Sequence, residues 1–119
     1  MKARTKEEWI KVYEKKVGLR YTPERHEITS FDPEHGFLGF IDPAYTERGV
    51  FEVHLLVGDG EYWTKAIKQA MLETGCTKIR FITRRNPETW IRKYGARIKA
   101  YIMEADIDDI KIWSNKEAL

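Results

Sequence analysis

Two side chains that can move a proton, Glu52 and His54, lie two residues apart in the apolar run from Val50 to Val57. In an extended strand this spacing places both on the same face. A carboxylate and an imidazole serve as general bases when burial moves their pKa values toward 7. A solvated strand face carries the same residue types, so the pair is either catalytic or simply exposed.

Directly after this run, the segment 58–63 (GDGEYW) combines two glycines with two carboxylates. The glycines allow a backbone to approach an anion, and the start of a helix offers free N–H donors. Asp59 and Glu61 oppose an anion, because a like-charge contact at ~4 Å costs about 4 kcal/mol near a protein surface. The helix dipole stabilises an anion at this position by only ~0.3–1 kcal/mol. The alternative is that Asp59 caps the helix and Glu61 pairs with Lys65.

Basic residues gather in the second half of the chain, between positions 80 and 99. They are Arg80, Arg84, Arg85, Arg92, Lys93, Arg97 and Lys99. Beside Trp90 and Tyr94, such a cluster suits nucleic-acid phosphates or the phosphates of a cofactor. A solvated face balanced by Glu88 and Glu104 is the third interpretation, and the net charge of only +2 favours it.

Several classes of protein are excluded by what the sequence lacks. The three histidines are widely spaced and Cys76 is the single cysteine, which predicts neither a metal site nor an internal disulfide. Walker, Rossmann and Gly-x-Ser-x-Gly motifs are missing. Without a secretory leader or a long apolar run, the chain is expected to be cytoplasmic and to have no membrane partner. Its 119 residues predict a single domain over positions 1–119.

The first half of the chain predicts one helix and three strands. Thr5 and Glu8 fit a capping box at the start of a helix that Gly18 ends. Runs at 26–31, 37–41 and 50–57 are joined by turn residues and predict an antiparallel meander. In the third run, alternation predicts one shared face for four residues, Phe51, Val53, Leu55 and Val57.

The second half predicts helices and strands in alternation. A helix follows Gly60 and stops at Gly75, a strand covers 77–83, and Asn86-Pro87 begins a short helix that Gly95 ends. Residues 97–105 alternate as a strand, 106–109 form a turn, and 110–113 form a last strand. The order is therefore α-β-β-β-α-β-α-β(-β). This is an α+β protein whose mixed, mostly antiparallel sheet has helices on both faces.

That order and three local segments resemble the GCN5-related N-acetyltransferase (GNAT) fold. Residues 50–57 with the helix after them resemble the family's central strand, and residues 78–83 (KIRFIT) resemble its neighbouring strand. Residues 86–96 (NPETWIRKYGA) resemble the family's segment of Asn, short helix and Gly-aromatic pair, in the form seen in divergent phage-encoded members. The resemblance covers roughly residues 26–105.

The resemblance implies transfer of an acetyl group from acetyl-CoA to an amine of a small molecule or a protein. It implies Glu52 or His54 as the general base. Where many members carry the acidic Tyr, this chain has Ile91, which leaves Tyr94 as the substitute. The residues implied to contact acetyl-CoA are Leu56, Val57, Gly58, Gly60, Tyr62, Trp63 and Asn86.

Two other functions remain open at this point. Asp59, Glu61 and Ile91 all depart from an active GNAT site, so the alternative is an inert GNAT-fold module that binds a protein partner or has a structural role. A regulator that binds nucleic acid through the cluster at 80–99 is the other, although the near-neutral net charge argues against a nucleic-acid partner.

Overall fold

A four-stranded sheet forms the centre of the protein, in a computed structural model that describes residues 3–83, 86–100 and 106–109. The sheet order is β1-β2-β3-β4, with strands β1 (Glu27–Asp32), β2 (Gly36–Ile41), β3 (Val50–Gly58) and β4 (Lys78–Phe81). Strands β1, β2 and β3 are antiparallel neighbours, and β4 runs parallel to β3. The predicted meander and the α+β class with a mixed sheet are confirmed.

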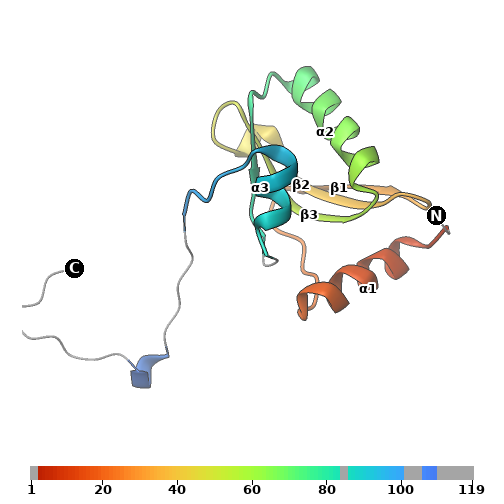
Figure 1. Ribbon diagram of the computed structural model, residues 1–119, viewed down its shortest axis with the longest axis vertical. Coiled ribbons are helices and arrows are strands. Elements are labelled where there is room, and N and C mark those ends of the chain that lie inside the picture. The colour runs from red at the N-terminus through yellow and green to blue at the C-terminus, as the bar shows by residue number, and fades with distance from the viewer. Residues whose placement is uncertain (1–2, 84–85, 101–105, 110–119) are drawn as a thin grey trace, which may run out of the picture.

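Three α-helices and two short 3₁₀ helices complete the described structure. They are α1 (Lys6–Val17), η1 (Pro43–Tyr45), α2 (Gly60–Thr74), α3 (Glu88–Tyr94) and η2 (Ile107–Asp109). Helices α1 and α2 cover opposite faces of the sheet (Figure 1). Helix α3 joins the layer of α2, because Trp90 stacks on Phe81 and packs against the core beneath α2. In the described ranges, no helix is long and apolar enough to cross a membrane.

The helix ends follow the local sequence signals. The Thr5 hydroxyl accepts a hydrogen bond from the Glu8 N–H, and the Glu8 carboxylate accepts one from the Thr5 N–H. Gly18, Gly75 and Gly95 end the three helices in the left-handed conformation. Helix α3 begins one residue later than predicted, at Glu88, yet the Asn86 side chain still accepts the Glu88 N–H at 2.9 Å.

A β-bulge at His54 changes which residues of β3 share a face. Gly39 pairs with Leu55 and Phe40 pairs with Val53, which leaves His54 as an extra residue. As a result, Leu55 and Val57 pack against Trp9 of α1, whereas Phe51, Val53 and Leu56 pack against Trp63 of α2. The prediction of one shared face for Phe51, Val53, Leu55 and Val57 is therefore wrong, because strict alternation does not survive a bulge.

The predicted strand at 97–105 is wrong in its described part. Residues 95–100 have no regular secondary structure, and 101–105 lie outside the described residues, as does the strand predicted at 110–113. Ile98 is 50% exposed, so the described part of this segment is not packed on the sheet. The strand predicted at 77–83 is shorter than expected, and the turn predicted at 106–109 contains η2.

Candidate functional site

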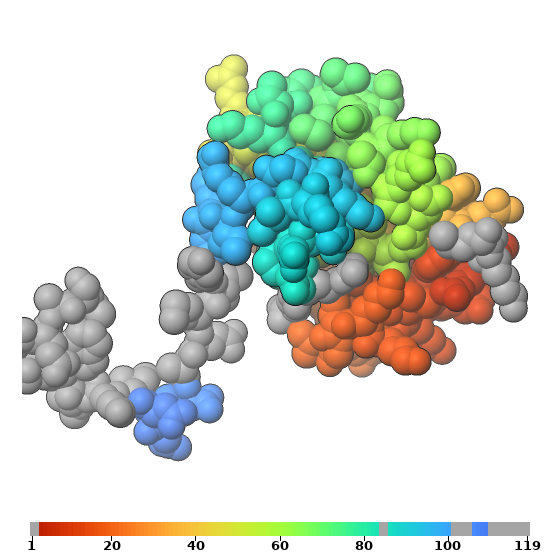
Figure 2. Space-filling view, in the orientation of Figure 1, coloured from red at the N-terminus to blue at the C-terminus, as the bar shows by residue number. Residues whose placement is uncertain are grey.

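An open groove lies at the carboxyl end of β3, where this strand meets α2 and α3. Its volume is about 470 Å³. Leu56 and Gly58 line it from β3, Gly60 from α2, and Trp90 and Tyr94 from α3. Figure 2 shows this side of the molecule, with α3 in cyan against the first turns of α2 in yellow-green and the end of α1 in orange below. All three helices therefore border the groove.

The groove exists because two parallel strands stop pairing. β3 and β4 are in register only from Val50 opposite Lys78 to Val53 opposite Phe81, and the Ile82 N–H then donates to the Val53 carbonyl at 3.0 Å. β3 continues to Gly58, while α3 takes the place beside it on the α2 face. The bulge at His54 sits at the point of separation. Bulges are frequent beside active sites, where they redirect side chains.

The groove is lined with positive charge. Lysines reach it from all three helices: Lys16, Lys65, Lys68 and Lys93. Among the described residues that line it, Glu61 is the one carboxylate, and it lies 3.5 Å from the Lys65 ammonium, as in the second of the two interpretations of the sequence. Asp59 is turned to its own helix, where one carboxylate oxygen accepts the Glu61 and Tyr62 N–H groups at 3.1 and 3.2 Å. The groove therefore favours an anionic ligand.

Tyr94 presents its phenol to this groove. Its hydroxyl is hydrogen-bonded to the Thr64 hydroxyl, which in turn donates to the Gly60 carbonyl at 2.6 Å. Because a threonine hydroxyl has a single proton, Tyr94 is the donor in the first of these bonds. Ile91 is not part of the groove lining and is 41% exposed. Of these two side chains, the phenol of Tyr94 therefore lies in the groove and that of Ile91 does not.

Glu52 and His54 lie on the other face of the sheet and do not line the groove. The His54 Nε2 atom is 2.6 Å from a Glu52 carboxylate oxygen, and the two side chains are 16% and 17% exposed. Arg80, the neighbour of Glu52 on β4, places its guanidinium 3.6 Å from the other Glu52 oxygen. These three side chains form a partly buried polar cluster beside the bulge.

The cluster extends to Glu47, which precedes β3. A guanidinium nitrogen of Arg80 donates to the Glu47 carboxylate at 2.6 Å. This hydrogen bond raises the pKa of Arg80 and, together with the charge of Lys99, lowers the pKa of Glu47. Arg80 is therefore a permanent cation between two carboxylates. Because Arg80 is paired with Glu47 and Glu52, its charge is not available to a ligand in the way that the basic cluster at 80–99 suggested.

The remaining cofactor residues expected from the resemblance lie outside the groove. Val57 is buried beneath α1, and Trp63 is 3% exposed in the core. The Tyr62 ring stacks on the His35 imidazole with 4.0 Å between centroids. Asn86 caps α3. Of the expected set, the structure thus brings together Leu56, Gly58, Gly60 and the phenol of Tyr94.

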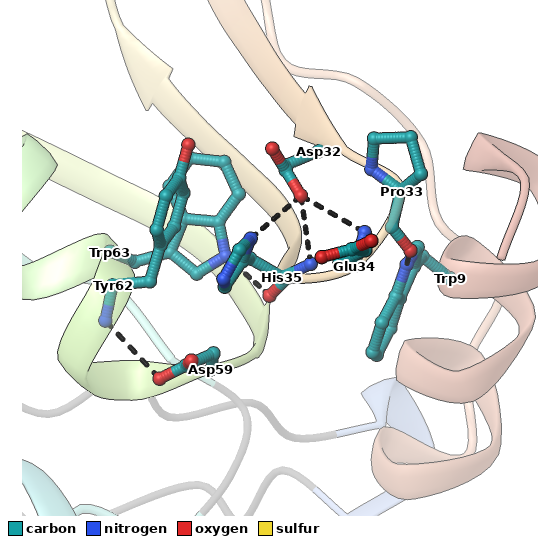
Figure 3. A network of polar contacts seen from close by, with 8 residues as sticks. All are labelled: Trp9, Asp32, Pro33, Glu34, His35, Asp59, Tyr62 and Trp63. Carbon is teal, nitrogen blue, oxygen red and sulfur yellow. Dashed lines mark hydrogen bonds and ion pairs between the residues drawn. The ribbon is translucent and has the colours of Figure 1, made fainter. Parts of the chain in front are cut away.

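The turn between β1 and β2 supports the start of α2, as Figure 3 shows. One oxygen of the Asp32 carboxylate accepts the Glu34 N–H at 2.9 Å, the His35 N–H at 3.0 Å, and contacts the His35 Nδ1 at 2.7 Å. The hydrogen bond with the His35 side chain is the main reason that the pKa of Asp32 is lowered. The His35 carbonyl accepts the Asp59 N–H at 2.8 Å, so this turn fixes the position of the α2 N-terminus.

Sequence reasoning named Lys93 in the basic cluster and Lys65 as the partner of Glu61, but it missed Lys16 and Lys68 as residues of the groove. Lys65 and Lys68 recur with Glu61 and Thr64 at helical spacing, which is a signal for one common face of α2. Lys16 comes from the first helix and has no such signal. The basic cluster at 80–99 is divided, since Lys93 reaches the groove, Arg80 pairs with Glu47, and residues 84–85 lie outside the described part. Among the described residues, no group of His, Cys, Asp or Glu is placed to hold a metal ion.

Comparison with known proteins gives no relative from which a role could be carried over. Neither a protein family, nor a curated protein, nor a solved structure matches this chain. The groove and the polar cluster at the bulge are therefore the features that bear on function.

Proposed function

We propose that the protein is a GNAT-like N-acyltransferase that moves an acetyl group from acetyl-CoA to an amine, with the groove as its cofactor site. The separation of β3 from β4 at the His54 bulge carries this proposal. Beyond Val53, β3 has backbone groups that β4 does not pair, near Leu56 and Val57. A backbone N–H there is suited to hold the oxyanion that forms when an amine attacks a thioester.

The residues around the groove supply the other parts of such a reaction. The amine nitrogen attacks the thioester carbonyl and loses a proton, and the thiolate of CoA leaves and gains one. Tyr94 is the donor for the thiolate, since its phenol lies in the groove and its proton, which the Thr64 hydroxyl accepts in this structure, turns to the departing sulfur. Glu52 or His54 takes the amine proton through water from the opposite face of the sheet, because both lie beside the bulge where β3 and β4 separate.

Calorimetry with acetyl-CoA tests the cofactor, and thiol release with a panel of primary amines tests the reaction. We expect heat of binding below millimolar acetyl-CoA, and amine-dependent release of free CoA that Glu52→Gln reduces. No heat at millimolar acetyl-CoA would overturn the proposal. An Arg48→Gln variant, which changes a residue outside both the groove and the cluster, serves as the control.

A binding module without turnover is the second candidate, and the position of the bases favours it. Glu52 pairs with both His54 and Arg80 on the face away from α2, and neither Glu52 nor His54 lines the groove. This candidate predicts that a CoA ester binds and that no amine accelerates thiol release. Turnover that disappears in Glu52→Gln would exclude it.

A further inference from the structure

The N-terminus of α2 is closed to an anion by the side chain of Asp59. The carboxylate of Asp59 accepts the Glu61 and Tyr62 N–H groups, and the Trp63 N–H is bonded to the Asp59 carbonyl. Of the first four N–H groups of this helix, these bonds leave only that of Gly60 for a ligand. An anion placed there would also face the Asp59 carboxylate. Helix-end binding of phosphate, which needs several free donors, is therefore disfavoured here.

Side-chain cations line the same groove. Lys16, Lys65, Lys68 and Lys93 line it from three helices, and all four are exposed. Within the described part of the chain, the ammonium groups of Lys16, Lys68 and Lys93 have no carboxylate within ion-pair distance. Such lysines act as point charges on flexible stems that adapt to a phosphate ligand.

We infer that the groove binds the diphosphate of its ligand through these four lysines, and not through the backbone at the start of α2. The inference rests on the proposed function only for the identity of the ligand as a CoA ester. Leu56 and Trp90 give the groove apolar walls, which suit the uncharged pantetheine arm of such a compound. The same lysines would hold inorganic diphosphate alone.

Calorimetry of paired variants tests this mode of binding, with CoA, pantetheine and inorganic diphosphate as probes. The groove pair is Lys68→Gln with Lys93→Gln, and the matched control is Lys11→Gln with Lys15→Gln, which removes the same charge from exposed positions on α1 outside the groove. We expect the Kd of CoA and of diphosphate to rise about tenfold in the groove pair. Pantetheine, which carries no phosphate, should bind both pairs equally, and the control pair should stay within about twofold of the unmodified chain.

A third variant separates side-chain binding from helix-end binding. Asp59→Gly frees the N–H donors of α2, and glycine is itself tolerated at the N-cap position. We expect CoA affinity to change by less than about threefold. A gain of tenfold or more in Asp59→Gly, or equal losses in the groove and control pairs, would overturn the inference while leaving CoA binding intact. Lysine-dependent binding of diphosphate without binding of CoA or pantetheine would instead support the inference and overturn the proposed function.

Discussion

Trp9 and Trp63 hold the same turn from the two faces of the sheet. The Trp9 indole donates to the Pro33 carbonyl at 3.0 Å, and the Trp63 indole donates to the His35 carbonyl at 2.9 Å (Figure 3). Both tryptophans are 3% exposed, Trp9 on the buried face of α1 and Trp63 on the buried face of α2. The β1–β2 turn therefore links both helical layers, and through His35 and Asp59 it also positions the groove.

Replacing either tryptophan with phenylalanine should destabilise the fold. Trp9→Phe or Trp63→Phe removes one hydrogen bond and part of a buried ring, at a cost of about 1–3 kcal/mol in the free energy of unfolding. Urea titration followed by circular dichroism measures the loss. Leu72→Ala, at a residue that is 79% exposed, is the control and should change stability by less than about 0.5 kcal/mol. A tryptophan variant as stable as this control would contradict the assigned role of the turn.

Two glycines near the groove should respond to alanine in opposite ways. A Cβ at Gly58 would lie 2.1 Å from the His35 carbonyl oxygen. The φ of Gly58 is +110°, a backbone conformation that is strained for a residue with a side chain. Gly58→Ala should therefore cost at least about 3 kcal/mol. Gly60 lies in the first turn of α2 with open space around its Cβ position, so Gly60→Ala should be neutral or stabilise by up to about 1 kcal/mol. Equal melting temperatures for the two variants would refute this contrast.

Asp32 should make stability depend on acid pH. The hydrogen bond with the His35 side chain lowers the pKa of Asp32 in the folded state, against about 3.9 in the unfolded chain. Its stabilisation is thus complete above about pH 4 and is lost as pH falls through the folded pKa. Asp32→Asn should be less stable than the unmodified chain at pH 6, and the gap should close toward pH 2. Urea titrations across this range measure it, and a gap that does not change with pH would exclude Asp32 as the source.

The Arg80 cluster should be more sensitive to loss of its cation than to loss of its outer carboxylate. Arg80→Met leaves the 17% exposed Glu52 carboxylate with His54 as its remaining partner, which should cost about 1–2 kcal/mol. Glu47→Gln should cost less, because Glu47 is 61% exposed and Arg80 keeps Glu52. Chemical unfolding of the two variants ranks them, and the reverse order would show that the contact with Glu47 dominates.

Features set by neighbours along the chain could be predicted from the sequence. The Thr5–Glu8 capping box, the Asp59 cap and the glycine at each helix end depend on a few adjacent residues, and all appear in the structure. The three-strand meander followed for the same reason, since short turns leave few topologies.

Features set by tertiary pairing could not be predicted. The bulge at His54 depends on how Gly39 and Phe40 of β2 pair with β3, and the pattern of residues within β3 does not indicate it. The groove joins Lys16 to Lys93 from opposite ends of the chain. Local alternation at 97–105 predicted a strand, but residues 97–100 have no regular secondary structure and Ile98 is exposed, because alternation does not by itself supply a pairing partner.

Tyr94 should be required for turnover and not for cofactor binding. Tyr94→Phe keeps the ring that packs against Phe81 and removes only the proton donor, so thiol release with acetyl-CoA should fall about 10²-fold or more. The Kd of CoA should change by less than about threefold. Tyr45→Phe makes the same chemical change at a residue that is 62% exposed and outside the groove, and it should leave turnover unaltered. If Tyr94→Phe retains full turnover, solvent rather than the phenol protonates the departing thiolate, and Tyr94 serves only to pack α3 against Thr64 and Phe81.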